Sequence, residues 1–84
     1  MKHATSAALD RLEPLLRELR AVGGIREKSR GTFYRGSRAF LHFHEHGDDV
    51  FADMRIGEDF ERFPATTEGQ RKALLKMLKA SLKS

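Results

Sequence analysis

Residues 39–56 read AFLHFHEHGDDVFADMRI, and this stretch decides the fold because apolar and polar side chains alternate on both sides of a glycine. Alternation with a period of two is typical of strands whose two faces differ. A two-residue turn at Gly47 and Asp48 would fold the stretch into a hairpin. The pairs that this register predicts are Glu45 with Val50, Phe43 with Ala52, His42 with Asp53 and Leu41 with Met54.

The preceding residues, TFYRGSRAF at 32–40, predict a second hairpin with Gly36 and Ser37 in its turn. Tyr34 would then face Ala39, and Phe33 would face Phe40. The two hairpins share their middle strand. We therefore expect three antiparallel strands within residues 25–56, followed by a loop over 57–66.

The side chains of this predicted sheet separate into two different faces, because neighbours along a strand point in opposite directions. A slip of one residue would mix the two sets, so their separation supports the register. The apolar face carries Tyr34, Ala39, Leu41, Phe43, Val50, Ala52, Met54 and Ile56, and the other face carries Phe33, Arg35, Phe40, His42, His44, Phe51, Asp53 and Arg55.

Two helices flank the strands. Leucines at positions 9, 12, 16 and 19 recur every three or four residues, which predicts a helix over 6–22 that ends at two glycines. Pro14 lacks an N–H, so it either kinks this helix or marks its beginning near Asp10. Thr67 and Gln70 have the spacing of a capping box and predict a second helix over 67–82.

The fold class expected from these elements is α+β. The chain of 84 residues suits one domain spanning 1–84. We predict a two-layer sandwich in the order helix, three-stranded antiparallel sheet, helix, with both helices on the apolar sheet face. The other sheet face is then left open, and any function that uses it must work with its side chains.

Composition limits the classes of function. The chain has no cysteine, which excludes disulfides and thiolate metal ligands. No apolar stretch is long enough for a membrane span or a signal peptide, so we expect a cytoplasmic protein with no membrane partner. The net charge of +4 is unevenly distributed: residues 26–38 and 71–83 are basic, and residues 45–61 are acidic.

Self-association is the first interpretation of the open face. Phe33, Phe40 and Phe51 would form an apolar patch larger than small monomers usually expose. A homodimer would bury them and let Arg35 and Arg55 meet acidic residues of the second copy. Alternatively, the segment with Phe60 and Phe63 could fold back over part of this face.

Nucleic-acid binding is the second interpretation, because exposed aromatics stack on bases and basic side chains contact phosphates. The acidic residues at 48–61 and the absence of a Gly-Phe-x-Phe motif count against it. The candidate contacts on the basic segment and its hairpin are Arg26, Lys28, Arg30, Arg35 and Arg38.

Metal binding is the third interpretation. His42 and His44 point to the same side of one strand, and Asp53 faces His42, which gives a ligand set suited to zinc or iron. His46 falls in or beside the turn and leaves the set. The alternative is a pair of solvated histidines in which Asp53 acts as a charge partner of His42.

Catalysis finds little support in the sequence. Gly23 and Gly24 lack the spacing of a phosphate-binding loop, and there is neither a cysteine nor a serine in a nucleophile-elbow motif. We therefore expect a non-catalytic interaction module without an obligatory cofactor.

The hairpin segment GTFYRGSRAFLHF, the strand VFADMRI and the order of elements resemble small bacterial proteins and, more distantly, the MmcQ/YjbR family. The shared motif is chiefly RGSRAFLHF, at residues 35–43. The resemblance implies a bacterial protein with a double-wing fold that binds DNA. The resemblance assigns no functional residue of that family to a position in this sequence.

Overall fold

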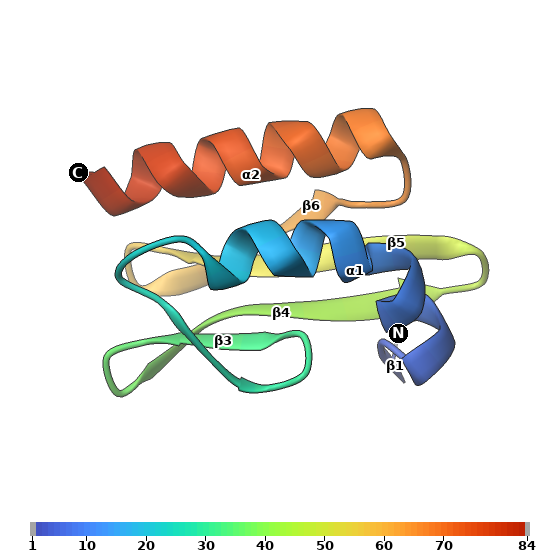
Figure 1. Ribbon diagram of the computed structural model, residues 1–84, viewed down its shortest axis with the longest axis horizontal. Coiled ribbons are helices and arrows are strands. Elements are labelled where there is room, and N and C mark those ends of the chain that lie inside the picture. The colour runs from blue at the N-terminus through green and yellow to red at the C-terminus, as the bar shows by residue number, and fades with distance from the viewer. Residues whose placement is uncertain (1, 84) are drawn as a thin grey trace.

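The computed structural model describes residues 2–83 and shows an α+β fold in which two helices lie against one antiparallel sheet (Figure 1). The elements are β1 (Lys2–His3), α1 (Ser6–Arg20), β2 (Arg26–Ser29), β3 (Thr32–Arg35), β4 (Arg38–His46), β5 (Asp49–Ile56), β6 (Asp59–Pro64) and α2 (Glu68–Lys83).

The sheet has six strands, so the prediction of three strands is wrong. Five strands follow the order β2-β3-β4-β5-β6, and β1 pairs with the C-terminal end of β4. The sequence analysis missed β1, β2 and β6, each of which pairs with one strand within residues 2–83. Strands at an edge are mostly exposed, so they need no strict apolar alternation.

The predicted loop over 57–66 is also wrong, because β6 occupies most of it. Gly57, with a φ of 65°, and Glu58 form a two-residue turn between the paired residues Ile56 and Asp59. Gly36 and Gly47 open the β3–β4 and β4–β5 turns with similar φ values of 64° and 61°. The sequence therefore carried the same turn signal a third time, but the charged strand after it gave no apolar pattern.

The long hairpin of β4 and β5 has the predicted register, including the pair of His42 with Asp53. The β3–β4 hairpin has it only near the turn, where Tyr34 pairs with Ala39. Beyond that pair the register shifts, so that Phe33 pairs with Leu41 and not with Phe40. A bulge of this kind adds one residue to one strand and changes which side chains share a face.

The bulge corrects the predicted open face at two positions. Phe33 is 0% exposed and Phe40 is 3% exposed, and both belong to the hydrophobic core. Neither therefore contributes to an exposed aromatic patch.

Both helices contribute to a single core on one side of the sheet, as predicted, and the ribbon shows them on the same side (Figure 1). The side chains that fill this core come mainly from α1, α2, Phe33 of β3 and the strands β4 and β5. Its largest buried members include Leu12, Leu16, Leu19, Leu41, Met54, Leu74 and Leu78.

The helix ends follow from local chemistry. Thr5 caps α1 by accepting a hydrogen bond from the N–H of Ala8, and the helix continues through Pro14, which excludes a beginning near Asp10. It ends at Arg20, two residues before the predicted end at Val22. The capping box is present at α2: the N–H of Gln70 donates to Thr67 Oγ1, and the N–H of Thr67 donates to Gln70 Oε1.

Within residues 2–83, neither helix combines the length and the apolar character that crossing a membrane would require.

Candidate metal centre

The three imidazoles of His3, His42 and His44 meet on the sheet face that the helices leave open. His42 and His44 lie two residues apart on β4, so their side chains share a face. β1 runs antiparallel beside the end of β4 and pairs His3 with His44. The ring centroids lie 5.0 Å apart for His3 and His44, and 4.8 Å apart for His42 and His44.

These rings present a set of possible metal ligands. One nitrogen from each of the three imidazoles lies within 4.8 Å of the other two. Zinc–nitrogen bonds of about 2.0–2.1 Å in a tetrahedral site correspond to nitrogen–nitrogen separations of roughly 3.4 Å. Small rotations of the side chains would therefore bring the nitrogens to coordination distance.

Two of the ring nitrogens have no hydrogen-bond partner among residues 2–83. Nδ1 of His42 and Nδ1 of His44 are buried, and neither has a hydrogen-bond partner among residues 2–83. Burying a polar nitrogen without a partner costs free energy, and most proteins avoid it. A metal ion bound to these nitrogens would remove that cost.

Asp53 determines which nitrogen of His44 carries the proton. Its Oδ2 lies 3.0 Å from Nε2 of His44. Because a nitrogen lone pair facing a carboxylate would be repelled, Nε2 carries a proton, and the tautomer that can bind a metal is the one with its lone pair at Nδ1. Carboxylates commonly orient metal-binding histidines in this way from behind the ligand.

Arg62 holds Asp53 in place and keeps it charged. Its Nε and Nη2 donate to the two carboxylate oxygens at 2.9 and 3.1 Å. These hydrogen bonds, more than the charges of the nearby histidines, lower the pKa of Asp53 below its usual value. Asp53 is therefore ionised at neutral pH although only 7% of its surface is exposed.

His42 is in the protonation state that metal binding requires. Burial of its ring lowers its pKa, and the neighbouring His44 lowers it further, which outweighs the opposite effect of Asp53. The ring is therefore neutral at pH 7 and has a free lone pair. Phe60 covers it from β6, with ring centroids 4.9 Å apart.

Two of the three predicted ligands, His42 and His44, belong to the observed cluster. The structure brings together His42, His44 and Asp53, but Asp53 is occupied by Arg62 and lies behind His44. The third ring is that of His3, which the sequence analysis did not single out. His46 is exposed at the end of β4, opposite Asp49 and next to the turn.

The remaining predicted residues of the open face are not members of this cluster. Phe51 is half-buried opposite His44, and Arg55 packs over the ring of Phe60. Arg35 is exposed beside the β3–β4 turn. The aromatic patch expected from Phe33, Phe40 and Phe51 is therefore reduced to one half-buried ring, supplemented by Phe60, which is 37% exposed.

The predicted basic contacts differ in the partners of their side chains. Arg30 is held by Asp10 and Glu13 of α1, and Lys28 lies over the ring of Tyr34. Arg26 is exposed on β2, and Arg35 and Arg38 are exposed on either side of the β3–β4 turn.

Sequence reasoning missed His3 and Arg62. Phe60 covers part of the open face from β6, as the alternative of a folded-back segment predicted, whereas Phe63 packs against the core. The turn at Gly57 was the available signal for this strand, because DFERFP at 59–64 has no apolar alternation. His3 carried no such signal, because its position depends on a pairing between residues 41 positions apart in the chain.

Comparisons of this chain with protein-family models, with curated proteins and with solved structures found no match. The likeness of residues 35–43 to the MmcQ/YjbR family stays a prediction.

Proposed function

We propose that this protein binds a divalent transition metal ion, zinc in the first instance, through His3, His42 and His44. The observation that carries the proposal is the pair of buried Nδ1 atoms of His42 and His44 that lack partners among residues 2–83. Both rings belong to a cluster in which one nitrogen of each of the three imidazoles lies within 4.8 Å of the other two.

The donor set supports a particular range of metals. Neutral imidazoles suit zinc, copper, nickel and iron, whereas magnesium and calcium prefer oxygen ligands. Three protein ligands leave one position of a tetrahedral zinc ion for water or another small ligand. Asp53 and Arg62 would serve the site by orienting His44, not by binding the ion.

Self-association loses support in comparison. Its argument depended on three exposed phenylalanines, and two of them are in the core. The open face instead presents histidines, a paired carboxylate and arginines, which a protein interface would have to desolvate.

The test is a thermal-shift titration of untagged, metal-free protein. A ligand at one hundred times its Kd stabilises the folded state by about 2.7 kcal/mol. For a domain of this size we expect zinc to raise the Tm by about 10 °C or more. Magnesium should have no effect.

Single variants His3→Ala, His42→Ala and His44→Ala should each abolish most of the zinc-induced shift. His46→Ala is the matched control, since that exposed histidine lies outside the cluster and should leave the shift intact. Each Tm without zinc shows whether the variant is folded. No shift with zinc, copper or nickel, or a shift that His44→Ala leaves unchanged, would exclude the proposal.

Amide hydrogen exchange gives a second measurement. The N–H of Ala4 donates to the carbonyl of Phe43 at 3.1 Å and reports on the docking of β1. A metal ion that joins His3 to β4 should slow exchange at Ala4. The N–H of Ala65, which donates to Val50 at 2.8 Å beside β6, should change less.

A further inference from the structure

A second unusual group of side chains lies at the opposite end of β4. A hollow of about 580 Å³ opens beside the β3–β4 turn, and three arginines, Arg35, Arg38 and Arg55, contribute to its lining. Arg38 and His42 are four residues apart on the same strand, or about 13 Å. The lining of the hollow contains no member of the histidine cluster.

Two of the arginines oppose each other directly. Arg35 and Arg38 are cross-strand partners at the turn of the hairpin. Like charges in such a pair destabilise a hairpin. No carboxylate among residues 2–83 lies within ion-pair distance of either guanidinium.

Four arginines elsewhere in the fold are paired with carboxylates. Arg17, Arg20, Arg30 and Arg62 each have a carboxylate oxygen within 3.8 Å. Their charges are balanced inside the protein. The positive charge beside the β3–β4 turn is not, which makes the hollow attractive to an anion.

Arg55 is held in place without being neutralised. Its Nε donates to the carbonyl of Ala39 and its Nη1 to the carbonyl of Glu58, both at 2.9 Å. The ring of Phe60 lies 4.4 Å from its Cζ. Because a guanidinium has five N–H donors and carbonyls carry no net charge, Arg55 keeps three donors and its full charge for a ligand.

The rest of the lining suggests how large the ligand is. Phe40 and Ile56 give the hollow an apolar part, and Ser81 of α2 adds a hydroxyl group. A volume of about 580 Å³ lies within the range of small-molecule sites. Glu58 and Asp59 follow Gly57 at its edge, and they would repel a long polyanion more than a compact one.

We infer that this hollow binds a small phosphorylated molecule, whose phosphoryl oxygens accept hydrogen bonds from Arg35, Arg38 and Arg55. Guanidinium groups match phosphate in charge and geometry and can donate two parallel hydrogen bonds. The bound phosphoryl group would also remove the repulsion between the two opposed arginines. This inference is independent of the proposed metal site.

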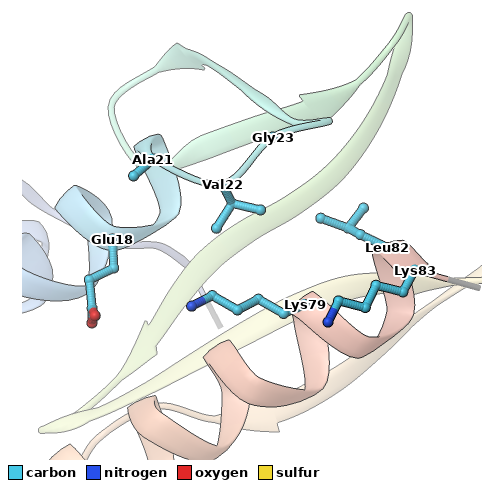
Figure 2. A pocket seen from close by; sticks show the side chains of 7 residues that line it. All are labelled: Glu18, Ala21, Val22, Gly23, Lys79, Leu82 and Lys83. Atoms are coloured by element: carbon cyan, nitrogen blue, oxygen red, sulfur yellow. The ribbon is translucent and has the colours of Figure 1, made fainter.

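A hollow of about 440 Å³ between the ends of α1 and α2 is the natural rival, and Figure 2 shows Glu18 and Lys79 extending into it from the two helices. Lys83 also lines it. Its charges are mixed, because the carboxylate of Glu18 would repel an anion that the two amines attract. It is therefore the less suitable phosphate site and supplies a matched control.

The test is a titration of the ¹⁵N-labelled protein with inorganic pyrophosphate at low salt, followed through the Nε–H signals of the arginines. We expect Arg55 and the backbone of residues 35–38 to shift. The double variant Arg35→Gln/Arg38→Gln should bind at least about tenfold more weakly, since it loses charge-assisted hydrogen bonds. The variant Lys79→Gln/Lys83→Gln removes the same charge from the rival hollow and should bind as the wild type does.

Three outcomes would overturn the inference. The first is no shift at millimolar pyrophosphate in the folded protein. The second is equal weakening by both double variants, which would show an unspecific response to net charge. The third is a single-stranded oligonucleotide that binds more tightly than pyrophosphate and depends equally on Arg35 and Arg38, which would assign the site to nucleic-acid phosphates.

Discussion

The two faces of the β4–β5 hairpin differ in what they contribute to the protein. The face beneath the helices carries Leu41, Phe43, Ala52 and Met54, all at most 3% exposed. The opposite face carries two histidines, an aspartate and an arginine on the same strands, with one further histidine and arginine on the flanking strands. Apolar burial on one face supplies most of the stability, and this leaves the second face free to hold polar groups in defined positions.

The largest expected effect is a difference in stability between substitutions of two phenylalanines, one on each face. Phe33 is fully buried in the core, so Phe33→Ala should cost about 3–5 kcal/mol of unfolding free energy. Phe60 is 37% exposed and contacts His42 and Arg55, so Phe60→Ala should cost less than about 1 kcal/mol. Urea unfolding measures both values, and similar costs would contradict the assignment of stability to one face.

Substitutions on the open face should change ligand affinity more than they change the free energy of unfolding. Asp53→Asn removes the charge that orients His44 and pairs with Arg62. If the metal proposal holds, zinc affinity should fall by about 10- to 100-fold, as is usual when the group behind a ligand is lost. Calorimetric titration measures the affinity, and Asp48→Asn in the exposed turn is the control. An unchanged affinity would show that Asp53 does not act through His44.

The smallest expected effect is on the pH dependence of stability. It arises at the edge of the sheet, where the ion pair of Arg20 with Glu27 joins α1 to β2. Burial raises the pKa of Glu27, but hydrogen bonds from Arg20 and the Gly31 N–H outweigh it, and the net pKa is below 4.5. Since the folded-state pKa is depressed, this stabilisation is complete above about pH 4.5 and is lost as the pH falls through the lower value.

The Gly31 amide signal in an NMR pH titration reports this event directly, because Gly31 donates to Glu27 at 2.9 Å. Its midpoint should lie below pH 4.5 in the wild type and move upward in Arg20→Gln. Residues in the centre of the core should not titrate over this range. A midpoint that Arg20→Gln leaves unchanged would contradict this role of the ion pair.

Local patterns predicted the parts of the fold in which burial imposes a period. Both helices, the long hairpin with all four of its predicted pairs, and the first two turn positions followed from spacing and glycine placement alone. The same patterns failed at the edges. β6 reads DFERFP, and its charged side chains are tolerated because only one side of the strand is paired.

The site divides in the same way. Alternation placed His42, His44 and Asp53 on one face, because a single strand and its nearest partner determine that arrangement. The predicted register of the first hairpin missed the bulge, beyond which Phe33 pairs with Leu41 and both side chains lie in the core.

The sequence by itself determined the two helices, the central hairpin and the polar character of its outer face, because each depends on periodicity within a few neighbouring residues. Only the tertiary structure decided that His3 joins His44, that Arg62 occupies Asp53, and that three arginines line one hollow. These arrangements depend on which distant segments pair at the edges of β4 and β5. The free energy of packing the whole chain determines which segments pair there, so no short stretch of sequence predicts it.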